Sequence, residues 1–290
     1  MRIITLGPKG TFSEEAALIY QKRICGQIDR ESIDLSSLPD CFGKVKASLA
    51  DRAVLPAENM VDGIIGLTFD LLLDYHNFIK VCDEVHVIIR HVLAGKMSLP
   101  TDIKEILSHP SALNQCAYNL SAGFSGIPQT PVLSTAEAAY RAAKEQGIAA
   151  VCSPRTARQY GLKIIQDNLG DYKENQTRFL VCSKTDSPPT GNDRTLLAVR
   201  FGINYPGQLN EITKYFLANQ IDLTFVQSRP YKLKPEEYIL LFEMIGHQSE
   251  VRFKETFCKI EEYLQKTGGW KRVLGSYPRR EKEELFVEEY

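Results

Sequence analysis

Short apolar segments that end at a polar turn and lead into a helical pattern recur along this chain as far as residue 154. The first spans residues 2–6, stops at a Gly-Pro-Lys-Gly turn and is followed by helical apolar spacing over residues 13–20. Further strands are expected at residues 53–56, 105–108, 131–133 and 147–152. Strands that alternate with helices in this way predict βαβ units, mainly parallel sheets and an α/β fold.

The pattern changes at residues 183–192, which are polar, contain Pro188 and Pro189 and lack periodicity. We interpret this segment as a linker. Beyond it, strands and helices are expected at residues 194–201, 208–219, 222–228, 238–245, 251–265 and 271–277, in the order βαββαβ. This ferredoxin-like order is typical of small ligand-sensing domains. The sequence therefore predicts a larger α/β region, residues 1–183, and a small domain, residues 193–280.

Charge and motif content exclude several classes of function. The 35 basic and 36 acidic residues nearly cancel, so we expect neither a nucleic-acid partner nor an anionic membrane surface. The N-terminus lacks the apolar stretch of a signal peptide and no apolar run could span a bilayer, which predicts a cytoplasmic protein. The seven cysteines and five histidines lack metal-ligand spacing, and phosphate-binding glycine loops are missing. No metal and no cofactor are expected.

Several strand-to-helix turns carry a hydroxyl or a proline where a helix would begin. Thr11 with Glu14 and Ser134 with Glu137 have the spacing of capping boxes, and a proline follows Ser153. Each of these residues, taken alone, is explained as a helix cap. Helix N-termini gather at the carboxyl ends of parallel strands, however, and their free N–H groups favour anions. The sequence predicts a cleft for a small carboxylic acid, lined by Gly10, Thr11, Ser108, Ser134, Thr135 and Ser153.

Two further polar groups lie beside apolar strands. Thr177 and Arg178 stand just before the apolar residues 180–182, where a hydroxyl and a guanidinium could bind an acid. An ordinary surface arginine explains Arg178 equally well. Glu58 and Asn59 follow the strand at residues 53–56 and would supply an acid or an amide, or serve only to tie the strand end to its neighbours.

These motifs, in their order along the chain, resemble those of the prephenate dehydratase family. They are GPKGTFS at 7–13, PAEN at 56–59, SHP at 108–110, STAEAA at 134–139, YGL at 160–162 and NQTRF at 175–179. Residues 206–207, 221–224, 228–230, 246–247 and 274–279 resemble the C-terminal ACT domain of that family. The resemblance implies conversion of prephenate to phenylpyruvate, with loss of water and CO2, in phenylalanine biosynthesis and without a cofactor.

The resemblance also implies a fold and a set of site residues. The fold would be like type II periplasmic binding proteins, with one lobe of about residues 1–80 plus 164–183 and another of 81–163. Thr177 would assist departure of the hydroxyl, within a catalytic motif of Thr177, Arg178 and Phe179. The implied substrate contacts are Thr11, Ser13, Glu58, Asn59, Ser108, Thr135, Ser153 and Asn175.

An effector site and an assembly are implied as well. The ACT domain would bind L-phenylalanine, a possible inhibitor, and would pair between subunits in a homodimer or homotetramer. The implied effector-binding residues are Gly207, Gln208, Leu209, Gln227, Ser228, Arg229 and Pro230.

The sequence departs from the family pattern at four positions. Met60 and Ile64 stand where the family usually has hydroxyl residues, and Gln208 and Gln227 replace an alanine and a glutamate of the effector motifs. Two alternatives therefore stay open. One is a related enzyme that acts on arogenate or another cyclohexadienyl acid, or decarboxylates without dehydration. The other is a non-catalytic small-molecule sensor, since both domains would be binding modules.

Overall fold

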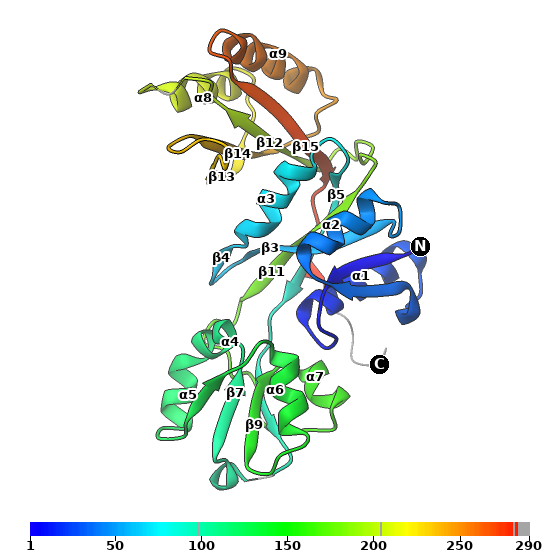
Figure 1. Ribbon diagram of the computed structural model, residues 1–290, viewed down its shortest axis with the longest axis vertical. Helices are drawn as coiled ribbons and strands as arrows, with labels where there is room; N and C mark the ends of the chain where they lie inside the picture. Colours follow the sequence, from blue (N-terminus) through cyan, green and yellow to red (C-terminus); the bar gives the residue numbers. More distant parts are fainter. Residues whose placement is uncertain (98, 204, 281, 284–290) are drawn as a thin grey trace.

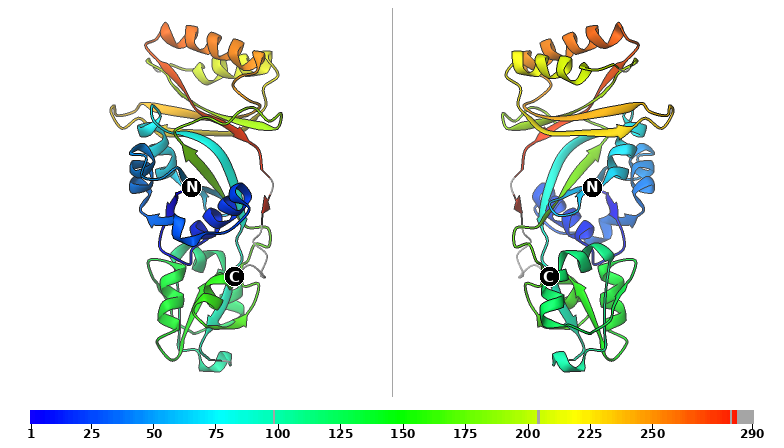
Figure 2. Two further views of the ribbon diagram at one scale, coloured as in Figure 1. Left: turned by 90° about the vertical axis from the view of Figure 1, so that its right-hand side faces the viewer. Right: turned by 90° about the vertical axis from the view of Figure 1, so that its left-hand side faces the viewer.

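The computed structural model describes residues 1–97, 99–203, 205–280 and 282–283, and these form three sheets stacked along the long axis of the molecule (Figure 1). The first lobe lies in the middle, the second lobe at one end and the C-terminal domain at the other, an arrangement that is seen again in both side views (Figure 2). The predicted α/β, two-lobed architecture followed by a small domain is confirmed.

The first lobe is built from two separate parts of the chain. Its elements are β1 (Ile3–Leu6), α1 (Phe12–Cys25), η1 (Arg30–Ser32), β2 (Ile33–Ser36), α2 (Leu38–Lys46), β3 (Arg52–Asn59), β4 (Gly63–Ile64), α3 (Gly66–Tyr75), β5 (Lys80–Ile88), β11 (Gln176–Ser183) and β16 (Lys282–Glu283). The sheet has the order β16-β5-β11-β3-β1-β2, with β4 on β3. β1 pairs in parallel with β2 and β3, whereas β11 runs antiparallel to both β3 and β5.

Alternating side chains cover the two faces of this sheet. Ile3 of β1 and Val54 of β3 pack against α1, whereas their neighbours Ile4 and Leu55 pack against α2 and α3. This period of two is the normal consequence of the strand pleat. The core on the α2 and α3 side continues into the C-terminal domain, where it includes Tyr277.

The second lobe is inserted between β5 and β11. It contains β6 (Val92–Gly95), η2 (Pro100–Asp102), β7 (Glu105–Ser108), α4 (Pro110–Gln115), α5 (Ala117–Gly123), β8 (Gln129–Pro131), α6 (Thr135–Ala142), β9 (Ile148–Cys152), α7 (Pro154–Gln159) and β10 (Lys163–Gln166), with strand order β10-β6-β9-β7-β8. The chain crosses between the lobes twice, at residues 89–91 and 167–175.

Three predictions about these lobes need correction. The predicted lobe boundaries near residues 80 and 164 are displaced, because β5 belongs to the first sheet and β10 to the second. The strand expected at 131–133 is β8, which ends at Pro131. The sheets are also less uniformly parallel than expected, since β11, β6 and β10 all pair antiparallel with their neighbours.

The C-terminal domain has the predicted βαββαβ order. Its elements are β12 (Asp193–Arg200), α8 (Gln208–Ala218), β13 (Leu223–Pro230), β14 (Tyr238–Ile245), α9 (Val251–Gln265) and β15 (Trp270–Pro278), in an antiparallel sheet of order β13-β14-β12-β15. Leu197 and Phe242 point to α8 and α9, whereas Leu196 and Leu241 point to the first lobe. Both faces of the sheet are therefore covered along the strands β12 and β14, whereas alternate residues of the edge strand β13 are exposed.

Gly275 allows this domain to lie directly against the first lobe. A Cβ atom at Gly275 would stand 2.1 Å from the carbonyl oxygen of Val81 in β5, and the backbone φ of 154° is one that side-chain-bearing residues rarely adopt. The close approach of β15 to β5 therefore requires glycine at this position.

Candidate functional site

A pocket of about 290 Å³ lies between the two lobes, and we call it the interlobe pocket. The turn from β1 into α1, the end of β3 and the start of β11 form one wall, and the beginnings of α4 and α6 form the other. Its lining residues are Leu6, Gly7, Pro8, Thr11, Phe12, Ser13, Pro56, Asn59, Asp62, Ile65, Ile89, His91, His109, Ser111, Ala112, Gln115, Leu133, Ser134, Thr135, Thr177 and Phe179.

Six of the predicted catalytic and substrate residues line this pocket. They are Thr11, Ser13, Asn59, Thr135, Thr177 and Phe179, together with Ser134 of the predicted cleft. The starts of α1 and α6, which belong to different lobes, thus meet at one pocket, as the helix N-termini predicted. Thr11 is the N-cap of α1, but its side chain does not close the expected capping box: Oγ1 donates to Pro8 O, and Glu14 accepts from Gly10 N instead.

The predicted contacts of Ser108 and Ser153 are corrected, because neither side chain lines the pocket. Ser108 Oγ donates to the carbonyl of Val151 at 2.6 Å inside the second lobe. Ser153 Oγ accepts from Thr156 N at 3.1 Å and so is the cap of α7. Gly10 is also absent from the lining, and its carbonyl accepts a hydrogen bond from the Thr156 hydroxyl. Ser153 thus follows the cap interpretation that the sequence left open, whereas Ser108 bonds across the sheet and His109 is the N-cap of α4.

The sheet register places Thr177 directly opposite Asn59. The two residues are partners in the antiparallel pair β11–β3, and Asn59 Nδ2 donates to Thr177 Oγ1 at 3.0 Å. The Asn59 amide has a fixed orientation because its Oδ1 accepts from the backbone N–H groups of Val61 and Asp62, both at 2.9 Å. Thr177 Oγ1 is therefore an acceptor toward Asn59, which leaves its own proton for donation to a ligand in the pocket.

A second group of polar side chains supports Asn59 from behind. Asn175 Oδ1 accepts from Asn59 Nδ2 at 3.0 Å, and Asn175 Nδ2 donates to Gln115 Oε1 at 2.9 Å. Gln115 Nε2 donates to Asp62 Oδ2 at 2.8 Å and to Ser111 Oγ at 3.1 Å. Asn175 does not line the pocket, so its predicted substrate contact is replaced by a role in this network.

Four polar residues of the pocket lining were not predicted from the sequence: Ser111, Gln115, Asp62 and His91. A signal for two of them existed, because Ser111 and Gln115 are four residues apart and so share one face of α4, the helix that starts behind His109. For Asp62 and His91 the sequence offers no comparable pattern, since both lie in short connections between strands.

The pocket lining offers few charged groups to an anion. Among the residues that the structure describes, it contains one carboxylate, Asp62, and two histidines, His91 and His109, but no lysine or arginine. The N-termini of α1 and α6 reach the pocket from opposite lobes, through Phe12 and Ser13 on one side and Ser134 and Thr135 on the other. Backbone N–H groups and helix dipoles therefore are the main source of positive potential for a bound carboxylate.

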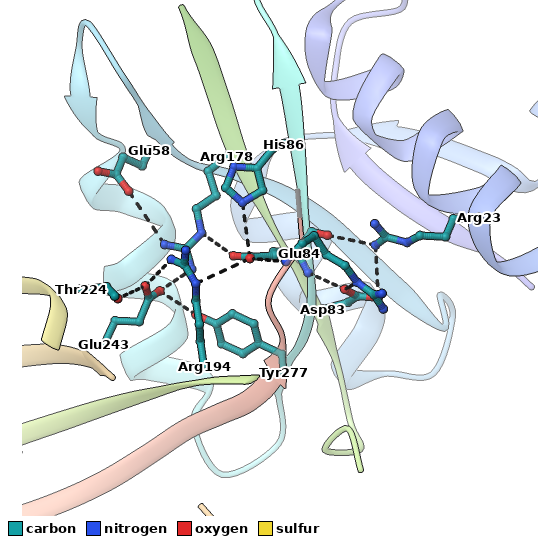
Figure 3. A network of polar contacts seen from close by, with 11 residues as sticks. Arg23, Glu58, Asp83, Glu84, His86, Arg178, Arg194, Thr224, Glu243 and Tyr277 are labelled. Atoms are coloured by element: carbon teal, nitrogen blue, oxygen red, sulfur yellow. Dashed lines mark hydrogen bonds and ion pairs between the residues drawn. The ribbon is translucent and has the colours of Figure 1, made fainter. Parts of the chain in front are cut away.

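Arg178 points to the opposite face of β11, and this corrects its predicted catalytic contact (Figure 3). Its Nε donates to Glu84 Oε2 at 2.7 Å, and one terminal nitrogen donates to Tyr277 Oη at 2.9 Å and to Glu243. Glu58 lies on this face too, 3.9 Å from Arg178, and does not line the pocket. The reason is strand geometry: β11 begins at Gln176, earlier than predicted, so Thr177 and Arg178 face opposite ways.

This interdomain network, formed by Arg178, Glu84, Glu243, Arg194 and Tyr277, joins the first lobe to the C-terminal sheet. Glu84 belongs to β5 and Glu243 to β14, and Arg194 of β12 donates to Glu243 Oε1 at 2.6 Å. Glu84 and Glu243 are 0% and 2% exposed. Because the residue after Thr177 is part of this network, β11 connects the interlobe pocket with the C-terminal domain.

The charge state of Glu84 predicts acid sensitivity of this connection. Burial acts to raise the pKa of Glu84, but contact with His86 and the charges of Arg178 and Arg194 outweigh it and lower the pKa from 4.5 to about 2. A carboxyl whose folded-state pKa is lowered stabilises the fold above its unfolded pKa and loses that contribution as pH falls toward the folded value. We expect a loss of roughly 3 kcal/mol of unfolding free energy from this group between pH 4.5 and 2.

Urea unfolding at several pH values in that window measures this loss. The matched variant is Glu84→Gln, which cannot titrate and should show a shallower dependence of unfolding free energy on pH. Equal pH dependence in the two proteins would contradict the assigned role of Glu84.

A second pocket, of about 380 Å³, lies in the C-terminal domain. Its lining residues are Phe201, Tyr205, Gly207, Gln208, Leu209, Ser228, Glu237, Tyr238 and Leu240. Four predicted effector residues are among them, whereas Gln227, Arg229 and Pro230 are not. Arg229 instead donates to Asp70 of the first lobe at 2.9 Å. Gln208 holds the turn before α8, because its Oε1 accepts from Tyr205 N and its Nε2 donates to Ile203 O.

The two unusual apolar residues near Asn59 lie outside the interlobe pocket. Met60 is 53% exposed, and Ile64 packs against the core of the first lobe. Neither side chain therefore replaces a group in the pocket wall. Within the described residues, no cluster of three potential ligands could hold a metal ion, and no helix is long and apolar enough to cross a membrane.

Comparisons with known proteins identify the family of this chain. The family model described as prephenate dehydratase matches residues 3–187. A bifunctional chorismate mutase/prephenate dehydratase of Aquifex aeolicus is 32% identical over 281 residues, which cover 96% of this chain and 74% of the relative. A prephenate dehydratase of Methanocaldococcus jannaschii is 33% identical over 277 residues, covering 93% and 96%. The solved prephenate dehydratase of Arthrobacter aurescens in complex with L-Phe has a TM-score of 0.85 at 27% identity, covering 99% and 93%.

Proposed function

The chain belongs to the prephenate dehydratase family, and from this premise we propose that it converts prephenate to phenylpyruvate in the interlobe pocket. Prephenate loses its ring hydroxyl and its ring carboxylate in this reaction. The C–O bond breaks, the bond to the carboxylate breaks, and the electron pair of the latter completes the aromatic ring. One proton is consumed, and water and CO2 leave. The enzyme must therefore orient the ring and protonate the departing hydroxyl.

Thr177 is the proposed donor to that hydroxyl. The observation that carries the proposal is the hydrogen bond from Asn59 Nδ2 to Thr177 Oγ1, which turns the threonine proton away from Asn59. An alcohol is a weak acid, so its contribution is a directed hydrogen bond that grows stronger as negative charge develops on the leaving oxygen. Solvent then restores the proton that is consumed.

The two carboxylates of prephenate suit different parts of the lining. The side-chain carboxylate, which stays in the product, is assigned to the N-termini of α1 and α6, where free N–H groups offer donors. The ring with its departing carboxylate is assigned to the apolar wall of Phe12, Ile89 and Phe179. Poor solvation of that carboxylate favours release of neutral CO2.

Arogenate is the competing substrate, and one observation favours it. Arogenate carries an ammonium group where prephenate has a keto group, and Asp62 is the single carboxylate in the described lining.

Measuring kcat/KM for both substrates with the purified protein tests the proposal. We expect prephenate to be preferred, because Asp62 is already bound to Gln115 and Ser111. A higher kcat/KM for arogenate would assign the chain to that substrate instead.

We further propose L-phenylalanine as the ligand of the C-terminal pocket. Phe201, Leu209 and Leu240 supply apolar walls for an aromatic ring. Glu237, which already pairs with Arg200 and Lys234, is the carboxylate of the described lining that the ammonium group would share. The α8 N-terminus at Gly207 faces the same pocket and suits the ligand carboxylate. The proposed consequence is feedback inhibition, transmitted through the interdomain network beside Thr177.

Thermal melting with added ligand tests this effector site. We expect L-phenylalanine to raise the melting temperature and to lower the rate, with stabilisation of about 2.7 kcal/mol when its concentration is 100 times Kd. The control ligand is 3-phenylpropanoate, which lacks the ammonium group and should bind at least about tenfold more weakly. Equal effects of the two ligands would rule out the assigned role of Glu237.

The proposed assembly is a homodimer or homotetramer, and the proposed location is the cytoplasm. Leu217 and Val251 of the C-terminal helices are 79% and 69% exposed, which leaves apolar surface for a second copy. All seven cysteines are free thiols, and this suits a reducing compartment.

A further inference from the structure

His91 lies at the boundary between the lobes and belongs to the lining of the interlobe pocket. It stands in the crossing that connects β5 with β6, is 3% exposed, and packs edge-on against Phe12 with ring centroids 5.7 Å apart. The polar atoms of a buried imidazole are normally hydrogen-bonded, and those that are not call for an explanation. No step of the proposed dehydration uses His91.

The hydrogen bonds around Gln115 determine which nitrogen of His91 carries the proton. Gln115 Nε2 donates to Asp62 and Ser111, so its Oε1 is the atom that faces His91 Nε2 at 2.9 Å. A carbonyl oxygen only accepts, and His91 Nε2 must therefore be the protonated nitrogen. Burial lowers the pKa of His91, which favours the neutral ring. Nδ1 has no hydrogen-bond partner among the described residues.

A directional series of amides leads from His91 to Thr177. Gln115 Oε1 also accepts from Asn175 Nδ2, and Asn175 Oδ1 accepts from Asn59 Nδ2. Each amide in the series can take only one orientation once Gln115 is fixed. The last donor is Asn59, whose Nδ2 also donates to Thr177 Oγ1. The Nε2–H of His91 is therefore one of the donors that hold this series in the orientation in which Asn59 donates to Thr177, together with Asp62 at Gln115 and the backbone N–H groups at Asn59.

We propose that His91 is a positioning residue for the dehydration, which acts through Gln115, Asn175 and Asn59 to hold the Thr177 proton toward the substrate. This inference rests on the proposed function of the interlobe pocket. It requires no contact between His91 and the reacting atoms. It predicts that a hydrogen-bond donor at the place of Nε2 is the property that matters.

Two substitutions distinguish the effect of losing the N–H donor from the effect of replacing the imidazole ring. His91→Leu removes the donor, and we expect kcat for prephenate to fall about tenfold or more while KM stays within about threefold. His91→Gln keeps an N–H group that can reach Gln115, and its kcat should stay within about threefold of the wild-type value. His247→Leu is the matched control, because His247 is also buried but lies in the C-terminal domain, bonded to Ser249 and Ser187.

Three outcomes would overturn the positioning role of His91. A wild-type kcat in His91→Leu, or an equal loss in the leucine and glutamine variants, would overturn the positioning role. Nitrogen NMR of labelled histidine supplies a readout that does not depend on activity, and protonation of Nδ1 in place of Nε2 would overturn it as well. Absence of turnover in the wild-type protein would instead refute the proposed function itself.

Discussion

Replacing Thr177 with alanine is expected to lower kcat for phenylpyruvate formation by about 100- to 10,000-fold, the usual contribution of a positioned proton donor. The hydroxyl of Thr177 accepts from Asn59 and has its proton free for the departing group. Alanine removes this donor but leaves the apolar wall and the helix N-termini in place. KM should therefore change by less than about threefold, because the lost interaction belongs mainly to the transition state.

Two further variants make this result specific. Thr177→Ser keeps the hydroxyl and should retain kcat within about tenfold. Thr213→Ala removes a threonine hydroxyl on α8 of the C-terminal domain, which among the described residues donates to Asn210 O, and should leave kcat unchanged. If Thr177→Ala turned over prephenate at the wild-type rate, Thr177 would not be the donor.

Replacing Arg178 with methionine is expected to cost about 3–5 kcal/mol of unfolding free energy, the range measured when one partner of a buried ion pair is removed. Arg178 lies between Glu84 and Glu243, which are both buried. Methionine would remove this guanidinium and leave the pairing with Arg194, which lies 3.7 Å from Glu84 and 2.6 Å from Glu243. Glu243 comes from the C-terminal domain, so the variant should also loosen its attachment to the first lobe.

Arg90→Met is the matched control for this experiment. Arg90 pairs with Asp167 at 3.5 Å, but both side chains are 51% exposed, and loss of such a surface pair should cost less than about 1 kcal/mol. Urea unfolding measures both variants. A similar small loss in both would mean that the interdomain network contributes no more than a surface ion pair.

Much of the fold could be predicted from the sequence, because strand periodicity, helix periodicity and helix caps are local patterns. The βαββαβ order follows from strand and helix periodicities between residues 193 and 278, and the caps at Ser134 and Ser153 mark real helix starts. The lobe boundaries were less accessible. β5 was not among the predicted strands, and its place in the first lobe is decided by antiparallel pairing with β11, nearly a hundred residues away.

Site residues could be predicted from the sequence only where they stand at the end of a strand or the start of a helix. Thr177 and Asn59 could be named, but their direct pairing depends on a sheet register that joins distant segments. Arg178 was misplaced because β11 already begins at Gln176, so the alternation of faces along the strand puts Thr177 in the pocket and Arg178 on the other side of the sheet. His91 and Gln115 become part of the site only through contacts between the lobes and their connections.

The proposed dehydration is tested most directly by the rate at which the purified wild-type protein forms phenylpyruvate and CO2 from prephenate. Product absorbance measures phenylpyruvate, and release of label from the ring carboxylate measures CO2. We expect saturable turnover well above the spontaneous rate, with one CO2 released for each phenylpyruvate. A rate equal to the spontaneous one, from protein that is folded and shows a cooperative melting transition, would contradict the proposed dehydration.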